Sequence, residues 1–324
     1  MRAPYTFCGG VHPPEHKAES NRLPIAAAPL PQRLIVPLRQ HTGTPAKPIV
    51  KVGDPVRKGQ MIAAADGFIS AAVHAPTSGT VGAIELHAVP HPSGLPDLCI
   101  VIEADGEERW IERKPLDYQT ADPDAVRGLL RDAGVVGLGG AVFPTYVKLN
   151  PGQQKIETLI LNGVECEPWI TSDDLLMRER AAEIVAGIRI MAHLMQPEQV
   201  LIGIEDNKPE AIAAMQAACQ GTNFEVVTVP VLYPSGGERQ LIKLLTGKEV
   251  PSGQRPINIG VVCSNTGTAY TVHRAVNHGE PVISRIVTIT GNVAKPQNFE
   301  ALIGTPLVEL VHLAGGAKPD TSRY

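Results

Sequence analysis

At the centre of the sequence, residues 137–148 read Gly-Leu-Gly-Gly-Ala-Val-Phe-Pro-Thr-Tyr-Val-Lys. Three glycines in four positions carry no Cβ atom, so the backbone N–H groups of this stretch can turn inward and approach a bound group closely. Pro144 fixes the turn, and Lys148 adds a cation at its far end. The stretch is typical of an anion-binding loop, and phosphate is the ligand that it predicts.

This stretch does not fit the dinucleotide fingerprint G-x-G-x-x-G/A. Counted from Gly137, the last position of that pattern is Val142. The preceding residues, 122–133, have a helical pattern, whereas the fingerprint requires a strand that leads into the turn. The sequence therefore disfavours an ordinary Rossmann dehydrogenase.

The same letters, GLGGAVFPTYVK, resemble the flavin-binding glycine loop of the NADH-oxidising subunit of respiratory complex I, which runs G-x-G-G-A-G-F-P-T-x-x-K. With the segments described below, the whole chain resembles the RnfC (also called RsxC) subunits of Rnf-type ion-translocating ferredoxin:NAD oxidoreductase complexes. The resemblance implies bound FMN that is reduced by NADH. It also implies 4Fe–4S clusters in a further C-terminal region, and we expect this chain to be truncated before them.

Composition limits the class of protein. At 324 residues the chain can form two or three domains, and a net charge of −4 with dispersed basic residues predicts no nucleic-acid partner. No apolar run approaches the roughly 20 residues of a membrane-spanning helix. The five cysteines form no C-x-x-C pair, so we predict no metal site. We expect a cytoplasmic chain that, by the resemblance, binds peripherally to the cytoplasmic face of the inner membrane.

The first third of the chain predicts an arm and a small β-domain. Residues 1–32 are proline-rich, and GGVHPPEHK at 9–17 resembles the opening of RnfC proteins, which we interpret as an extended structural arm. Residues 33–104 resemble the lipoyl/biotinyl barrel-sandwich, but the hairpin tip at 63–69 has no carrier lysine, so we predict a packing module. We predict its strands at 34–38, 50–54, 56–62 and 75–81.

The remaining chain predicts an α/β domain followed by a small β-module. Residues 105–283 alternate helices and strands, which favours a Rossmann-like α/β domain. The resemblance implies that this domain binds FMN and NADH. Residues 284–313 resemble a soluble-ligand-binding β-grasp (SLBB) module with a helix at 306–311, and residues 314–324 are a predicted linker tail. In the α/β domain we predict strands at 158–161, 200–204, 224–229 and 257–262, and helices at 122–133, 172–195 (capped by Ser172), 209–219, 237–245 and 267–277.

Small polar turns follow three of the predicted strands, and functional groups in parallel sheets gather at the carboxyl ends of strands. The turns are NGVECEP at 162–168, YPSGGERQ at 233–240 and CSNTGTA at 263–269. They resemble N-A-D-E-S-E-P, Y-x-x-G-E-E-T and N-N-V-E-T-L of complex I. The resemblance places the NADH contacts on Glu167 and Glu238, and the FMN contacts on Gly137, Gly139, Gly140, Ala141, Phe143, Lys148, Asn162, Glu165, Tyr233, Gly236, Asn265 and Thr268.

No side chain is predicted to act as a general acid or base, because hydride transfer belongs to the two cofactors. Electrons would leave through iron–sulfur centres of the other Rnf subunits, and indirectly through ferredoxin-type carriers. Two alternatives stay open. One is a cobalamin reductase of bacterial microcompartments with a similar core. The other is a non-catalytic scaffold with a vestigial flavin pocket, because Val164 and Gly237 replace acidic residues of the complex I motifs.

Overall fold

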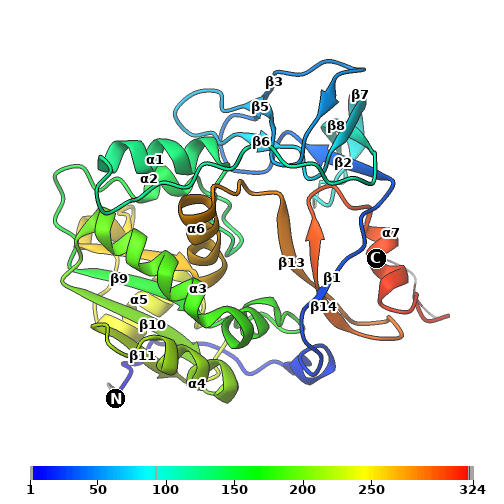
Figure 1. Cartoon of the computed structure of the whole chain (residues 1–324). Coiled ribbons are helices and arrows are strands. Elements are labelled where there is room, and N and C mark those ends of the chain that lie inside the picture. Colours follow the sequence, from blue (N-terminus) through cyan, green and yellow to red (C-terminus); the bar gives the residue numbers. More distant parts are fainter. Residues whose placement is uncertain (1–2, 92, 320, 322–324) are drawn as a thin grey trace. The chain divides into compact units, whose positions relative to one another are not determined.

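The computed structural model describes residues 3–91, 93–319 and 321. They form two compact units, each made of two separate stretches of chain. Unit 1 comprises Met1–Pro24 and Lys148–His273, and unit 2 comprises Ile25–Val147 and Arg274–Tyr324. Figure 1 shows the helices and strands of each unit.

Unit 1 is built on a four-stranded parallel sheet with the strand order β11–β10–β9–β12. Its strands are β9 (Thr158–Gly163), β10 (Gln199–Glu205), β11 (Phe224–Val229) and β12 (Val261–Asn265). β9 and β10 are buried along almost their whole length, as expected for parallel strands that are covered on both faces.

Helices cover the two faces of this sheet. In Figure 1, α3 (Ser172–Met195) and α4 (Pro209–Ala218) lie in front of the strands and α5 (Glu238–Thr246) lies behind them. The buried leucines of α5 pack on Ile160, Leu201 and Val227 of the strands. After the short helix η2 (Pro256–Ile259) and β12, α6 (Thr266–His278) begins directly at the sheet edge.

The contact between α3 and α6 depends on a glycine. A Cβ atom at Gly187 of α3 would come within 1.8 Å of the carbonyl oxygen of Ala269 in α6. Because backbone cannot yield at that distance, only glycine fits, and the start of α6 is held against the middle of α3. Gly187 therefore sets the position of the start of α6 and of the polar turn at the end of β12.

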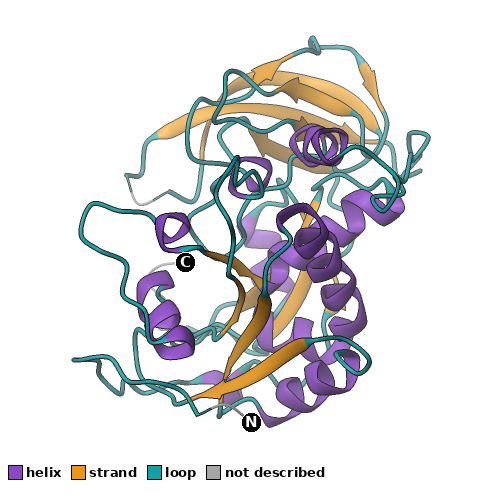
Figure 2. Cartoon of the chain, turned by 90° about the vertical axis from the view of Figure 1, so that its left-hand side faces the viewer, coloured by secondary structure: helices purple, strands orange, loops and turns teal. Residues whose placement is uncertain are grey.

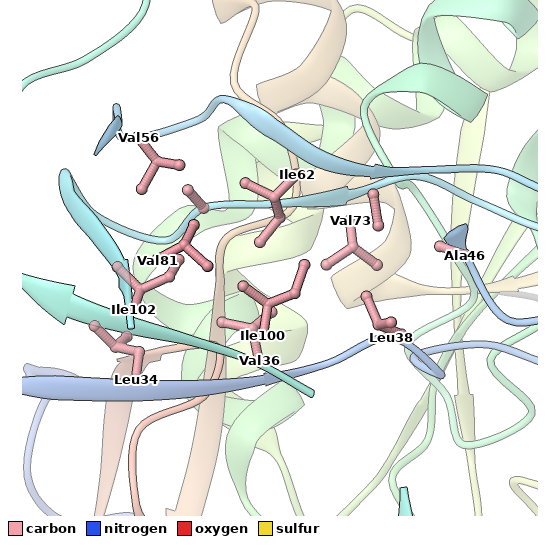
Figure 3. Close-up of a cluster of buried hydrophobic side chains, with 12 residues drawn as sticks. Leu34, Val36, Leu38, Ala46, Val56, Ile62, Val73, Val81, Ile100 and Ile102 are labelled. Atoms are coloured by element: carbon pink, nitrogen blue, oxygen red, sulfur yellow. The ribbon is translucent and has the colours of Figure 1, made fainter. Parts of the chain in front are cut away.

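The barrel-sandwich of unit 2 consists of two antiparallel sheets that share one aliphatic core. One sheet contains β2 (Arg33–Pro37), β8 (Pro96–Ala104), β7 (Gly79–Ala88) and β4 (Pro55–Val56), and the other contains β3 (Lys47–Pro48), β5 (Met61–Ala64) and β6 (Val73–His74). Alternate residues of β2 are buried, which is the period of a strand with one face on a core. Figure 3 shows the core side chains, among them Leu34, Ile62 and Ile100, pointing toward one another.

The rest of unit 2 contains α1 (Pro123–Asp132), the start of α2 (Thr145–Lys148) and a small sheet. The Asp122 side chain accepts a hydrogen bond from the Asp124 N–H and so caps α1. The small sheet has the order β1 (Ala26–Ala27), β14 (Gln297–Leu302), β13 (Ser284–Ile289), and α7 (Leu307–Leu313) packs on it through Leu310. Helices and strands alternate along unit 1, whereas the described residues of 26–104 in unit 2 form strands and loops alone (Figure 2).

Most of the predicted elements of the α/β segment are confirmed, and several predicted strands are wrong. The predicted strand at 257–262 is η2 followed by β12, because Pro256 favours the first turn of a helix. The predicted barrel strand at 34–38 is confirmed as β2, the one at 50–54 falls on a turn, and the one at 75–81 overlaps only the start of β7. The strand predicted at 56–62 is split between β4 and β5 by a turn with Gly59 at φ 81°. The N-cap of α3 is Thr171 rather than Ser172.

Candidate functional site

The carboxyl ends of β9 and β12 and the loop before α5 meet at one edge of the unit 1 sheet. Asn162 of β9 and Asn265 of β12 are directly opposed in the register. The Asn162 amide donates to the carbonyl oxygen of Gly236 at 2.8 Å, and the Asn265 amide donates to the carbonyl oxygen of Asn162 at 3.4 Å. Two side-chain amides thus join the three predicted polar turns into one surface.

Glu165 organises the turn that follows β9, which we call the acidic turn (residues 162–170). Its carboxylate accepts hydrogen bonds from the N–H groups of Asp173 at 2.7 Å and Asp174 at 3.2 Å, and from the Ser172 hydroxyl at 3.3 Å. Glu165 therefore satisfies the free donors at the start of α3, which the Thr171 side chain does not cap. Its φ of 49° is a strained value for a non-glycine residue, and these bonds hold it.

The charge of Glu165 is strongly perturbed. Part of the side chain is exposed, but the carboxyl group lies among protein atoms, and this burial raises its pKa to about 8. The neighbouring Asp173 charge raises the pKa further, while the charges of Lys17 and Lys208 lower it. Asp173 itself accepts a hydrogen bond of 2.6 Å from the Asn265 amide, so the perturbed carboxyl group is linked to the end of β12.

Glu167 and Tyr233 form a second contact at the same edge. The Tyr233 hydroxyl donates to the Glu167 carboxylate at 3.2 Å, and the Glu167 charge raises the pKa of the phenol. Gly236 lies so close to the acidic turn that a Cβ atom there would come within 2.9 Å of the Cys166 sulfur. The turn before α5 can therefore approach Glu167 only because this position is a glycine.

The remaining predicted residues of unit 1 are placed differently. Lys148 and Glu238 form a partly exposed ion pair with 2.9 Å between Nζ and Oε1. Thr268 is buried inside α6, with 1% of its surface exposed, so its side chain offers no open surface to a ligand.

Sequence reasoning missed a buried charged cluster under this edge. The Lys208 ammonium bonds to the Glu205 carboxylate at 2.9 Å, and both side chains are 1% exposed. The Ser235 hydroxyl donates to the other oxygen of Glu205 at 3.0 Å. This cluster ties the end of β10 to the turn before α5. The available signal was the sequence Glu-Asp-Asn-Lys at 205–208, which places charges directly after an apolar strand.

Sequence reasoning also missed Lys17. Only 7% of this residue is exposed, and its ammonium donates to the carbonyl oxygens of Glu165 at 2.7 Å, Glu167 at 3.0 Å and Ile170 at 2.7 Å. Burial lowers the pKa of this lysine, and the Glu165 charge opposes the shift. The only sequence signal was the lysine that ends the motif at 9–17.

The glycine loop, residues 137–147, belongs to unit 2 and is described by itself. The Gly137 N–H donates to the carbonyl oxygen of Phe143 at 2.8 Å and closes the loop. Carbonyl oxygens of the loop also accept bonds from side chains: Arg285 donates to Leu138 at 2.6 Å and the Thr42 hydroxyl donates to Ala141 at 2.8 Å. The Tyr146 hydroxyl of the loop donates to the carbonyl oxygen of Phe68. Fixing the loop through its carbonyl oxygens suits a site in which N–H groups meet an anion.

Gly140 is the position where the glycine loop needs glycine. Its φ is 105°, a conformation that side chains rarely adopt. A Cβ atom there would have no heavy atom within 4 Å, so a larger residue would project into open space.

A cavity of about 680 Å³ lies at the opposite edge of the unit 1 sheet, where β9 begins. Its lysines are already paired, Lys155 with Glu198 and Lys248 with Glu157. We therefore take the carboxyl edge as the candidate site, because the positive φ of Glu165 and its raised pKa coincide there. Within residues 3–91, 93–319 and 321, no group of three or more His, Cys, Asp or Glu side chains could hold a metal ion. The described helices include none with the length and apolar character needed to cross a membrane.

Three family models match the chain in succession. The RnfC barrel sandwich hybrid domain matches residues 5–107, the Nuo51 FMN-binding domain matches residues 130–274 and the SLBB domain matches residues 286–323. The predicted fold class, with its three modules in this order, is confirmed.

Relatives cover nearly the whole chain. The chain is 55% identical over 322 residues to the C component of the ion-translocating oxidoreductase complex of Pseudomonas aeruginosa, a match that covers 98% of this chain and 42% of that protein. The proteins of the same name from Klebsiella pneumoniae and Yersinia pestis are 52% and 51% identical over 314 residues, covering 96% of this chain and 42% and 50% of theirs. The chain therefore spans half or less of the length of these curated relatives.

A solved structure supports the fold. The NAD+-reducing [NiFe]-hydrogenase, in its air-oxidized and H2-reduced states, is similar with a TM-score of 0.53 and 25% identity. The similarity covers 60% of this chain and 39% of that one.

Proposed function

The chain belongs to the RnfC family of ion-translocating oxidoreductase complexes, and we propose that it is the part of an RnfC protein that binds FMN and exchanges hydride with NADH or NAD. The observation that carries the proposal is the edge of the unit 1 sheet, where Asn162, Asn265 and Glu165 join three polar turns. The match to the Nuo51 FMN-binding domain over residues 130–274 includes both this edge and the glycine loop.

The residues of the glycine loop fit the phosphate of FMN. The loop is fastened through its carbonyl oxygens, and Gly140 faces open space, which is the arrangement that an anion bound by backbone N–H groups requires. We assign Gly137, Gly139, Gly140, Ala141 and Phe143 to this role.

The side chains at the edge of unit 1 are suited to a flavin. Side-chain amides both donate and accept hydrogen bonds, and carboxyl oxygens accept them, so these groups suit hydroxyl and ring N–H groups. We assign Asn162, Glu165, Tyr233, Gly236 and Asn265 to the flavin. Lys148 and Thr268 keep the predicted flavin role, and because the Thr268 side chain is buried, its contact would come from the backbone of α6.

NADH is assigned to Glu167 and Glu238. Glu167 is exposed and its carboxylate is oriented by the Tyr233 hydroxyl, so it can accept hydrogen bonds from ribose hydroxyls. Glu238 is half-exposed, and Lys148 orients its carboxylate in the same way. The protein then contributes position and electrostatics rather than proton transfer.

Bound FMN supplies a ring that accepts a hydride and releases electrons one at a time. We propose that these electrons pass to iron–sulfur centres of the full-length protein and of the other Rnf subunits, and indirectly to ferredoxin-type carriers. The chain would bind these partners at the cytoplasmic face of the inner membrane. We also propose the domain boundaries 1–32, 33–104, 105–283, 284–313 and 314–324.

The test is an anaerobic titration followed by the visible absorbance of the flavin. FMN is added to the chain first, and free FMN is removed by gel filtration before NADH is added. We expect the flavin absorbance to remain with the protein and to bleach on addition of NADH. Protein that retains FMN but does not bleach would favour the scaffold alternative, and protein that retains no FMN would overturn the proposal.

A further inference from the structure

The N-terminal segment at residues 11–20, which we call the arm, contacts Glu167, which is assigned to NADH, and Tyr233, whose hydroxyl donates to the Glu167 carboxylate. We propose that this arm sets the position of Glu167 and Tyr233, and that Lys17 is its positioning residue. The inference rests on the proposed function. It assigns to the arm a role in nucleotide recognition in addition to a structural role.

Lys17 holds the backbone of the acidic turn. All three N–H donors of an ammonium group have acceptors here, because Nζ lies within 2.7–3.0 Å of the carbonyl oxygens of Glu165, Glu167 and Ile170. An almost fully buried cation that served packing alone would be costly, since burial penalises its charge. Three carbonyl groups of one short turn offset that cost only while the turn keeps its shape.

The arm also holds the turn that carries Tyr233. Val11 and Tyr233 form an antiparallel bridge in which each backbone N–H donates to the other carbonyl at 2.9 Å. The Trp169 N–H donates to the carbonyl oxygen of Glu15 at 2.9 Å, and the rings of His16 and Trp169 stack with centroids 4.0 Å apart. One continuous segment therefore reaches both sides of the Glu167–Tyr233 contact.

The two acidic residues of the turn depend on the arm to different extents. The Glu165 carboxylate is anchored to the N–H groups that begin α3, so it keeps its place without Lys17. The recorded contacts of Glu167 in the described chain are the Tyr233 hydroxyl and the Lys17 ammonium. Tyr233 stays bridged to Val11 when Lys17 is lost. Loss of Lys17 should therefore impair NADH binding and leave FMN binding almost intact.

The experiment compares wild type, Lys17→Met and the control Lys243→Met. Lys243 belongs to the same unit, and its ammonium also bonds to a carbonyl oxygen, that of Gly247 at 3.1 Å, but it does not touch the acidic turn. FMN and NADH affinities are measured by calorimetry, and KM and kcat are measured with NADH and ferricyanide. Amide hydrogen exchange over residues 164–171 is measured in ligand-free protein.

For Lys17→Met we expect the NADH Kd and KM to rise at least about tenfold, with FMN affinity and kcat changed less than about threefold. Amide exchange in residues 164–171 should accelerate, and Lys243→Met should match wild type throughout. A Lys17→Met protein that binds both nucleotides like wild type would overturn the inference. So would a folded variant that loses FMN and NADH equally.

If Lys17→Met does not fold, His16→Ala is the second test. His16 is exposed, and its loss removes the stack on Trp169 and a contact with Glu19 inside the arm. We expect its NADH Kd to rise about threefold with FMN affinity unchanged. An unchanged NADH Kd would then contradict the inference. If wild type itself binds neither FMN nor NADH, the proposed function is wrong and this inference is wrong with it. If wild type binds both and the arm variant binds NADH equally well, only this inference is wrong.

Discussion

The acidic turn of unit 1 is held by buried charged groups, whereas the glycine loop of unit 2 is held by hydrogen bonds to its carbonyl oxygens. Lys17, Glu165 and Glu205 join the acidic turn and its neighbour to α3 and β10. In the glycine loop, Thr42 and Arg285 donate to carbonyl oxygens, and the Tyr146 hydroxyl donates to the carbonyl oxygen of Phe68. Both regions are thus held by the protein itself, the acidic turn by buried charges and the glycine loop by hydrogen bonds to carbonyl oxygens.

The largest expected effect tests the buried charges of unit 1. Lys208→Met leaves the Glu205 carboxylate buried without its cation, so we expect the free energy of unfolding to fall by about 3–5 kcal/mol. Urea denaturation measures the change. The matched control is Lys155→Met, which breaks the surface pair with Glu198 and should leave the denaturation midpoint unchanged. Equal midpoints for the two variants would show that the buried Lys208–Glu205 pair stabilises unit 1 no more than a surface ion pair does.

The pH dependence of stability tests the state of Glu165. Its pKa is raised in the folded protein from about 4.5 to about 8, so its stabilising contribution is complete below pH 4.5 and is lost as pH rises through 8. The groups that set this pKa are Asp173, Lys17 and Lys208. Glutamine cannot ionise, so the free energy of unfolding of Glu165→Gln should not fall over this pH range for that reason. Because part of Glu165 is exposed, we expect the variant to gain about 2 kcal/mol over wild type between pH 5 and pH 8.

Chemical denaturation at several pH values measures this gain. Glu167→Gln is the matched control, because it lies in the same turn but is exposed, and its stability should follow wild type at every pH. A Glu165→Gln curve parallel to that of wild type would show that the Glu165 carboxyl group is not perturbed.

The smallest expected effect concerns the glycine loop. Thr42→Val keeps the shape of the side chain and removes the hydroxyl that donates to the Ala141 carbonyl at 2.8 Å. Since a single hydrogen bond contributes about 1 kcal/mol, FMN affinity should fall by about fivefold, as calorimetry would measure. Thr305→Val removes a hydroxyl-to-carbonyl bond of the same length, to Leu302, and should leave FMN affinity unchanged. An FMN affinity reduced more than about a hundredfold in Thr42→Val would mean that the loop depends on this one hydrogen bond far more than expected.

The sequence predicted the elements of unit 1 well, because long apolar strands such as β9 and a 24-residue helix such as α3 have strong periodic patterns. It predicted the barrel strands poorly, because β3, β4 and β6 have two residues each and carry no measurable period. Turn chemistry rather than hydrophobic pattern fixes such short strands.

Within the candidate site, sequence reasoning located the turns but missed what holds them. Asn162, Glu165 and Asn265 lie within motifs that resemble a known family, so they could be named in advance. Lys17 could not, because the carbonyl groups that it binds lie about 150 positions away in the chain. Side-chain to backbone contacts at such a separation leave no periodic pattern for sequence analysis to detect.

The central claim, that open N–H groups near Gly140 bind the FMN phosphate, is tested most directly by calorimetric titration of FMN into wild type, Gly140→Val and Gly291→Val. Both glycines have positive φ, 105° and 80°, and both have open space at the Cβ position, so the two substitutions impose comparable backbone strain in unit 2. We predict micromolar or tighter binding for wild type and Gly291→Val, and binding about a hundredfold weaker for Gly140→Val. A wild-type chain that does not bind FMN, or a Gly140→Val chain that binds FMN as tightly as wild type, would contradict the account.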